Sequence, residues 1–169
     1  MADIFTKAKR SAVMAAIRSR GNKGTELRMM ALLRAQGITG WRRQQKLRVG
    51  KLTVGRKGSG AQRVRKNTRL PTLSSQRTRS VSVDFVFPKL RVAVFVDGCF
   101  WHACPKHGTR PAGNRAFWRA KLVRNAERDR EVTRALRKAG WSVLRVWEHD
   151  LAAKHWPRVA RRMSRALGR

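Results

Sequence analysis

The apolar positions near the start of the chain recur at the spacing of amphipathic helices. Residues 8–17 carry an alanine- and methionine-rich pattern that predicts a short first helix. A second helix is expected to begin at Thr25, which is a good N-cap residue, and to end at Gly37. The apolar side chains of this second helix follow helical spacing: Leu27, Met30, Leu32 and Leu33.

The spacing becomes that of β-strands after residue 80. Residues 81–87 are β-branched and aromatic, and residues 91–97 hold five consecutive apolar side chains, as in a strand buried on both faces. Residues 141–147 predict a third strand. A long helix is expected over residues 115–139, and a last helix runs from Pro157 to about residue 167.

The ends of the long helix are marked in the sequence. Asn114 can cap its start, Gly140 ends it, and a break is expected near Asn125. The predicted order is two helices, an optional strand, two strands, a helix, a strand and a helix. This order indicates one α/β domain over residues 1–169, with a sheet flanked by helices and no internal repeat.

Residues 50–80 break this pattern. They are rich in Gly, Ser, Thr, Gln, Arg and Lys, with scattered apolar residues. Such a composition predicts a flexible basic insertion within the domain. An insertion of this length is uncommon in a compact domain and suggests a functional reason.

Charge changes the picture more than overall composition does. The 169 residues include 41 Lys and Arg but 9 Asp and Glu, a formal net charge of +32. This balance favours a polyanionic partner, with nucleic acid first and an anionic membrane second. No apolar run reaches the ~20 residues of a membrane span, and no secretory signal is expected. The 2 cysteines exclude a disulfide framework and favour a reducing compartment.

Two of the few acidic residues lie in apolar, strand-like runs. If Phe87 faces Arg91 across the predicted hairpin, Asp84 lies opposite Val94, and its carboxylate lies near the Val96 carbonyl and Asp97. Oxygen ligands at the end of a buried strand suit Mg²⁺, which can polarise a phosphodiester and activate water. The alternative is that Asp97 begins a turn and Asp84 pairs with an arginine. The acids at residues 127–131 are interpreted as surface ion pairs.

A dense group of cysteines and histidines follows the second strand. Cys99, Cys104 and His107 could supply three ligands to Zn²⁺, and His149 is the best candidate for a fourth. The alternative is that the cysteines are small buried apolar residues and the histidines lie on the surface. His102 is left over, and it would suit a general base near neutral pH.

Phe100 and Trp101 stand side by side between polar residues. Exposed aromatic side chains beside a basic surface can stack between bases, although ordinary core packing is the alternative. Met14 has the same two interpretations on the first helix.

These residues together resemble a known family. The segments Asp84-Phe85-Val86 and Val94 through His102 (VFVDGCFWH) are similar to those of the very-short-patch repair endonucleases, bacterial enzymes that nick DNA at T:G mismatches. The resemblance covers residues 1–48 and 81–150. The supporting matches are Lys9-Arg10-Ser11 with Met14, Thr25-Glu26-Leu27, Phe117-Trp118 with Lys121 and Asn125, Glu127-Arg128-Asp129, Gly140-Trp141 and Trp147-Glu148-His149.

The resemblance implies a restriction-endonuclease-like fold and a role for each matched residue. Asp84 and the backbone at Val96 would bind Mg²⁺, His102 would activate water with Asp97 close by, and Glu26 is a possible support. A structural zinc would be held by Cys99, Cys104, His107 and His149. Phe100, Trp101 and Met14 would intercalate beside the mismatch, and Lys121 and Asn125 would contact the mismatched bases. The enzyme would cut on the 5′ side of the thymine, as a monomer in the bacterial cytoplasm, associated with the nucleoid, with other repair proteins as possible partners.

The sequence departs from the family pattern at three places. Some members carry a histidine where Asp97 stands, and the zinc ligands vary in type. The family usually has a short loop ending in Gly-x-Pro before the aspartate, whereas here Ser82-Val83 precede Asp84 after roughly 30 extra basic residues. Two alternatives therefore stay open. One is a non-catalytic, zinc-stabilised DNA- or RNA-binding module, and the other is a restriction-type enzyme that cuts paired duplex at a defined sequence.

Overall fold

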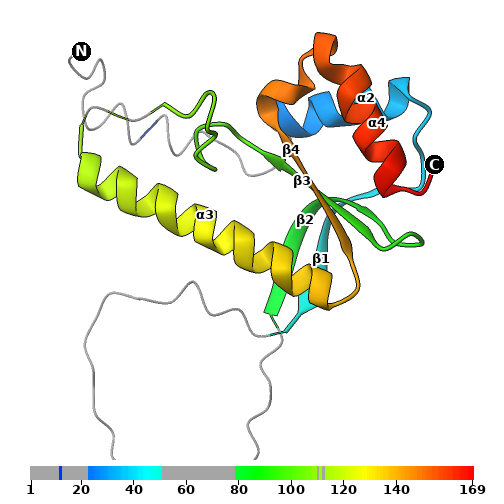
Figure 1. The fold of residues 1–169 in the computed structure, drawn as a ribbon, viewed down its shortest axis with the longest axis horizontal. Helices are drawn as coiled ribbons and strands as arrows, with labels where there is room; N and C mark the ends of the chain where they lie inside the picture. Colours follow the sequence, from blue (N-terminus) through cyan, green and yellow to red (C-terminus); the bar gives the residue numbers. More distant parts are fainter. Residues whose placement is uncertain (1–11, 13–22, 51–78, 110, 112) are drawn as a thin grey trace, which may run out of the picture.

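The computed structural model describes residues 12, 23–50, 79–109, 111 and 113–169 (Figure 1). The predicted first helix over residues 8–17, with Met14, lies outside the described residues apart from residue 12. So does most of the predicted insertion at residues 50–80. Residues 79 and 80 do not belong to an insertion, because they pair with Val49 and Arg48 at the start of a strand.

Among the described residues, four strands form a single mixed sheet in the order β1-β2-β3-β4. The optional strand is present as β1 (Arg42–Val49), and it pairs antiparallel with β2 (Arg79–Phe87). Strand β2 pairs antiparallel with β3 (Val92–Asp97), which pairs in parallel with β4 (Ser142–Trp147). The parallel pair needs a crossover, and the long helix α3 (Arg115–Lys138) supplies it.

Helices cover both faces of this sheet, which confirms the predicted α/β class. Helices α2 (Arg28–Ala35) and α4 (Trp156–Ala166) lie on one face, and α3 lies on the other (Figure 1). The first core joins α2 and α4 to the sheet through Met29, Leu32, Leu33, Phe85, Phe87, Val94, Val159 and Met163. The second core joins α3 to it through Val81, Val83, Ala93, Phe95, Val132 and Leu136. All six residues of β3 are buried, as its apolar run predicts.

The register of the β2–β3 hairpin differs by one residue from the prediction. Phe87 pairs with Val92 instead of Arg91, because Arg91 belongs to the turn and has a φ of 51°. Alternation along β2 is also interrupted near Asp84, since Val83 belongs to the core under α3 whereas Phe85 belongs to the opposite core. In a regular strand these two residues would share a face. Asp84 therefore lies where the strand is locally distorted.

The helix ends agree with the sequence only in part. The second helix begins with a π-helical turn (Lys23–Leu27), so Thr25 lies inside this turn and is not the cap of α2. Gly37 follows the helix with a φ of 61°, as expected for a residue that ends a helix in the left-handed conformation. Helix α3 has no break at Asn125, and Asn114 precedes it without a side-chain capping bond.

Two short 3₁₀ turns, η2 (Glu148–Leu151) and η3 (Ala153–His155), join β4 to α4. Pro157 lies in the first turn of α4, as predicted. Within the described part of the chain, no helix is both long and apolar enough to cross a membrane.

Candidate active site and cysteine–histidine cluster

The largest group of predicted site residues lines one cavity of about 770 Å³ between the sheet and α3. Asp84, Asp97, His102 and Asn125 all line it, as does the backbone of Val96. The remaining polar residues of the wall are mainly basic: Arg79, Arg124, Arg128 and Arg145, with Ser80, Ser82 and Asp129. A cavity lined by both acids and arginines can accept an anionic ligand and a cation together.

Asp84 lines this cavity and is held by the neighbouring strand β3. Its Oδ2 accepts a hydrogen bond of 2.9 Å from the Val96 amide, so the carboxylate meets the Val96 backbone at the N–H group, whereas the sequence pattern predicted the carbonyl. Burial raises the pKa of Asp84 from 3.8 to about 6, and the nearby Glu26 and Asp97 add to this, while the Val96 hydrogen bond and His102 oppose it. A bound cation would favour the ionised form of this carboxylate, whose ionisation is costly without one.

Asp97, at the end of β3, is paired with an arginine that the sequence analysis did not single out. Arg145 Nε lies 2.7 Å from Asp97 Oδ2, and Arg145 Nη2 lies 2.5 Å from Asp97 Oδ1. The arginine pairing suggested for Asp84 is therefore found at Asp97. Burial opposes the charged guanidinium, but the hydrogen bonds to Asp97 and the charges of Asp97 and Asp129 raise the pKa of Arg145.

His102 is oriented by an acid from helix α3. Its Nδ1 lies 2.6 Å from Asp129 Oδ2 and 3.5 Å from Asp97 Oδ1. Burial raises the pKa of Asp129, but the hydrogen bond to His102 and the charge of Arg145 outweigh this and lower it. The interpretation of the acids at 127–131 as surface ion pairs is wrong for Asp129. Its spacing was the missed signal, because Asn125 and Asp129 stand four residues apart on one face of α3.

Glu26 is buried beside this cavity, with 4% of its surface exposed. Arg43 Nη2 and Gln44 Nε2 from β1 each lie 2.5 Å from its carboxylate. Gln44 has a φ of 50° and stands between the β1 residues that pair on either side of Asp84. Glu26 therefore connects the distorted part of the sheet to the start of α2, consistent with a supporting position.

The four predicted zinc ligands also come together. One donor atom from each of Cys99, Cys104, His107 and His149 lies within 4.8 Å of the others. Cys99 Sγ is 3.2 Å and Cys104 Sγ is 3.6 Å from His149 Nδ1. Two thiols and two imidazoles are a donor set that tetrahedral zinc accepts, so these residues fit the metal.

The backbone around this cysteine–histidine cluster is tightly folded. The Gly108 amide donates to the Cys104 carbonyl at 2.8 Å, and a Cβ at Gly108 would lie 2.5 Å from that carbonyl oxygen. The Cys99 amide donates to Glu148 Oε2 at 3.1 Å. His149 Nε2 lies 3.5 Å from Asp150 Oδ1, so a carboxylate faces the ring nitrogen opposite the cluster.

The aromatic residues form a partly buried group at the N-terminal end of α3. The ring of Trp118 lies 5.3 Å from that of Phe100 and 6.1 Å from that of Trp101. Lys121 Nζ lies 5.1 Å from the centre of the Trp101 ring, and Asn125 donates to the Trp101 carbonyl at 2.9 Å. Phe100 and Trp101 are each partly exposed, whereas the neighbouring Phe117 is 52% exposed. Lys121 and Asn125 thus contact the protein itself in this conformation.

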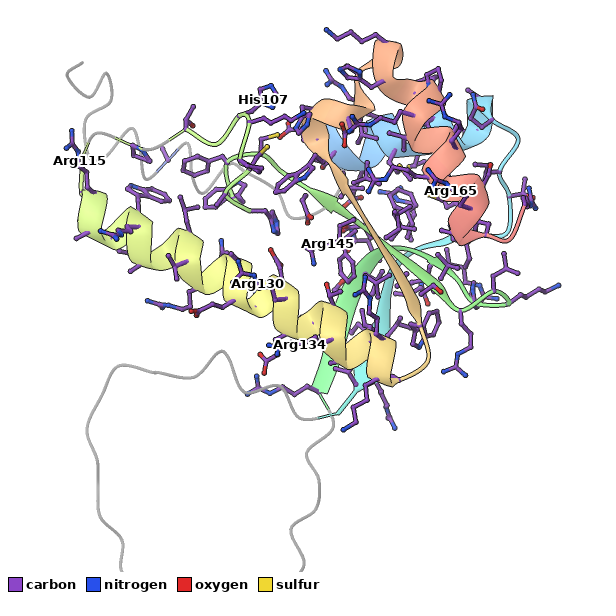
Figure 2. The ribbon with its side chains drawn as sticks, in the orientation of Figure 1. His107, Arg115, Arg130, Arg134, Arg145 and Arg165 are labelled. Atoms are coloured by element: carbon purple, nitrogen blue, oxygen red, sulfur yellow. The ribbon has the colours of Figure 1, made fainter. Side chains whose placement is uncertain are left out.

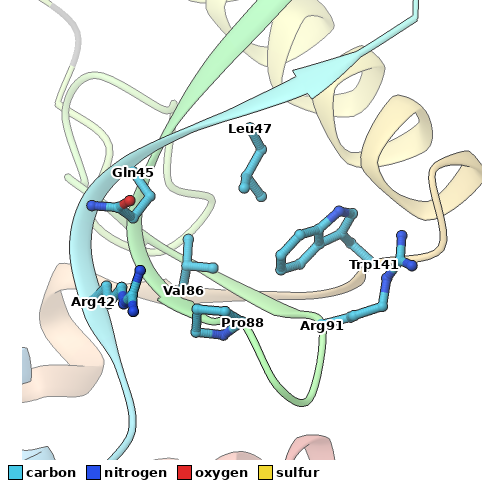
Figure 3. Close-up of a pocket in the computed structure, with 7 residues that line it drawn as sticks. All are labelled: Arg42, Gln45, Leu47, Val86, Pro88, Arg91 and Trp141. Atoms are coloured by element: carbon cyan, nitrogen blue, oxygen red, sulfur yellow. The ribbon is translucent and has the colours of Figure 1, made fainter.

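Arg145 lies in the space between the sheet and α3 (Figure 2). The other labelled arginines of the helices are Arg130 and Arg134 on α3 and Arg165 on α4. A smaller hollow of about 440 Å³ lies elsewhere, bounded by Arg42, Gln45, Leu47, Val86, Pro88, Arg91 and Trp141 (Figure 3). It shares no lining residue with the first cavity and includes none of the predicted site residues.

Comparison with known proteins agrees with the family resemblance. The sequence profile described as DNA mismatch endonuclease Vsr matches residues 2–57 and 74–107. The chain is 33% identical to the DNA mismatch endonuclease Vsr of Escherichia coli over 155 residues, covering 91% of this chain and 78% of that protein. It is 34% identical to the type II nicking enzyme V.NmeAIP of Neisseria meningitidis over 156 residues, covering 91% of this chain and 87% of that enzyme.

A stronger but shorter similarity exists to a third relative. The type II nicking enzyme V.NaeI of Lentzea aerocolonigenes is 59% identical over 70 residues, which are 41% of this chain and 42% of that enzyme. The match to V.NmeDIP of Neisseria meningitidis likewise covers 47% of that enzyme. The chain therefore spans less than half the length of these two relatives.

Proposed function

The chain belongs to the DNA mismatch endonuclease Vsr family, and we propose that it nicks duplex DNA on the 5′ side of the thymine of a T:G mismatch. The proposed reaction is magnesium-dependent hydrolysis of one phosphodiester, in very-short-patch repair of deaminated 5-methylcytosine. The observation that carries the proposal is the meeting of Asp84, the Val96 backbone and His102 in one cavity walled by arginines.

Several residues of the cavity have a role in this reaction. Asp84 and the backbone carbonyl oxygen of Val96 would hold Mg²⁺, which when bound would polarise the phosphodiester and lower the pKa of the attacking water. His102 would accept a proton from the attacking water at Nε2, because its Nδ1 faces Asp129 and Asp97. The guanidinium groups of Arg124 and Arg128 provide binding partners for the phosphates flanking the cut.

The aromatic group would recognise the mismatch. Phe100 and Trp101, with Met14, are proposed to insert between base pairs, which costs less at a mismatch because its pairing is weaker. Lys121 and Asn125 would exchange their contacts with Trp101 for contacts with the mismatched bases. Binding and base recognition would thus be coupled through Trp101.

The cysteine–histidine cluster would stabilise this arrangement. Cys99, Cys104, His107 and His149 would hold a structural zinc, which joins the segment carrying Phe100, Trp101 and His102 to the end of β4. The mixed sheet, with its acid in the β2–β3 hairpin, supports a restriction-endonuclease-like fold. The family resemblance supports a monomer that acts on nucleoid DNA in the bacterial cytoplasm.

A nicking assay on a labelled duplex with one central T:G pair tests the proposal. We expect a cut 5′ to the mismatched thymine with Mg²⁺, no cut with EDTA, and no cut in a matched T:A duplex. Asp84→Ala should abolish the cut and keep DNA binding, whereas the control Glu127→Gln, at an exposed position of α3, should retain both. Binding without cutting would favour the non-catalytic module, and equal cutting of the T:A duplex would favour a restriction-type enzyme.

A further inference from the structure

Arg145 lines the cavity but has no part in the reaction described above. Arg145 stands on β4 in a run of otherwise mostly apolar residues, and its guanidinium reaches two acids from different elements. Its guanidinium forms a bidentate ion pair with Asp97 of β3, and Arg145 Nη2 lies 3.1 Å from Asp129 Oδ1 of α3. One planar cation therefore connects the sheet to the helix above it.

Both acids that Arg145 holds face the same nitrogen of His102. Asp129 Oδ2 is 2.6 Å and Asp97 Oδ1 is 3.5 Å from His102 Nδ1. An ionised carboxylate only accepts hydrogen bonds, so the hydrogen of a neutral imidazole belongs on Nδ1. The lone pair then resides on Nε2, the position that a general base requires.

The same contacts show whether these side chains form a metal site or position His102. Donor atoms of Asp97, His102 and Asp129 lie within 4.8 Å of one another, which would also suit a metal ion. However, the guanidinium already bonds both oxygens of Asp97 and approaches Asp129. Asp97 is only 4% exposed, so Arg145 also prevents an unpaired buried charge.

We propose that Arg145 is a positioning residue, which fixes Asp97 and Asp129 so that they hold His102 with hydrogen on Nδ1 and the Nε2 lone pair directed at the reacting water. The inference rests on the proposed function, in which His102 is the base. Lysine cannot replace this arginine, because an ammonium group is a point charge without the planar fork that bonds two carboxylates at once.

Single-turnover nicking of the T:G duplex tests this role in the full chain. A base displaced by ~1 Å costs ~100-fold in rate, so Arg145→Gln is expected to lower the nicking rate constant about 100-fold. The matched control is Arg165→Gln, which removes the same charge from an exposed position on α4. Both variants should bind DNA with affinities within about threefold of each other, so that the difference lies in the rate and not in binding. Arg145→Lys should restore less than one tenth of the lost rate.

A double variant keeps the test valid if Arg145→Gln folds poorly. Asp97→Asn with Arg145→Gln leaves no unpaired buried charge, so its melting temperature should return toward that of the wild type. Its rate should stay at least about 30-fold low. A double variant that nicks as fast as the wild type would overturn the proposal, because Arg145 would then serve only to neutralise Asp97. The proposal would also be overturned if Arg145→Gln nicked the T:G duplex at the same rate as Arg165→Gln.

The imidazole nitrogen resonances of ¹⁵N-labelled protein give a readout that needs no DNA, with His102→Gln to assign the signals. We expect His102 to carry its hydrogen on Nδ1 in the wild type and in Arg165→Gln, and to show mixed tautomers in Arg145→Gln. Unchanged His102 nitrogen shifts in Arg145→Gln would refute the positioning role. If the wild type failed to nick any T:G duplex, the proposed function would fail, while this measurement would still decide the role of Arg145.

Discussion

The carboxylate proposed to bind Mg²⁺ should destabilise the protein when no cation is present. Burial raises the pKa of Asp84 to about 6 in the folded chain, from 3.8 when it is free in water. Its ionisation in the folded state is thus disfavoured. Asp84→Asn removes the ionisable group and keeps an oxygen that can accept the hydrogen bond from the Val96 amide. We therefore expect this variant to be more stable than the wild type near pH 8.

The magnitude and its pH dependence follow from this shift. A raised pKa means that the contribution of Asp84 to stability is fully present below pH 3.8 and is lost as the pH rises through about 6. A shift of this size corresponds to about 3 kcal/mol at ~1.4 kcal/mol per pKa unit, and residual solvent contact makes that an upper value. The advantage of Asp84→Asn should therefore be near zero at pH 4 and about 1–3 kcal/mol at pH 8.

Urea unfolding in a metal-free buffer with chelator, at several pH values between 4 and 8, measures this difference. Adding Mg²⁺ should stabilise the wild type by an amount that rises with the logarithm of its concentration above Kd, and it should leave Asp84→Asn unchanged. Glu127→Gln, which removes an exposed carboxylate of α3, should shift stability by less than about 0.5 kcal/mol at every pH. An Asp84→Asn variant no more stable than the wild type at pH 8, or equally advantaged at pH 4 and 8, would refute the reasoning.

Three further predictions concern the cysteine–histidine cluster and the aromatic group. Zinc removal by a strong chelator should lower the melting temperature of the wild type, and Cys104→Ser should show a smaller drop because it binds zinc less tightly. Calorimetry measures both melting temperatures, and an equal decrease in the two proteins would contradict the assignment of Cys104 as a zinc ligand. Gly108→Ala should cost about 1–3 kcal/mol of unfolding free energy, because its Cβ meets the Cys104 carbonyl at 2.5 Å, whereas Gly50→Ala, with no atom within 4 Å, should be near neutral. Trp101→Ala should weaken binding to a T:G duplex by about 1–3 kcal/mol, the range for base stacking, and binding to a T:A duplex by less. Equal losses on both duplexes in a titration would argue against a role in mismatch recognition.

Part of the candidate site could be located from sequence because most of its residues are close neighbours in the chain. Cys99, Cys104 and His107 fall within one short segment, and His149 follows the third predicted strand. The closeness of Asp84 to Val96 needed only a short hairpin, so it was expected, although the register is shifted by one residue and the contact is to the N–H and not to the carbonyl. Local spacing carries such information because a short segment between two residues allows only a limited range of distances between them.

The rest of the site could not be found in this way. His102 and Asp129 are separated by 27 positions, and Asp97 and Arg145 by 48. Their contacts depend on where α3 crosses the sheet and on which face of β4 is turned toward it. Asp129 looked like part of a surface charge cluster because sequence spacing shows which residues share a helix face but not what that face packs against.

The sequence by itself determined the order of the elements from β2 to α4, the basic character of the chain and the residues of the cysteine–histidine cluster. These depend on local periodicity, on composition and on short-range spacing. Only the tertiary structure decided that β2 changes face near Asp84, that Asp97 is neutralised by Arg145, and that Asp129 orients His102. The physical reason is that ion pairing and burial depend on distances in space, which are set when two cores pack helices onto both faces of one sheet.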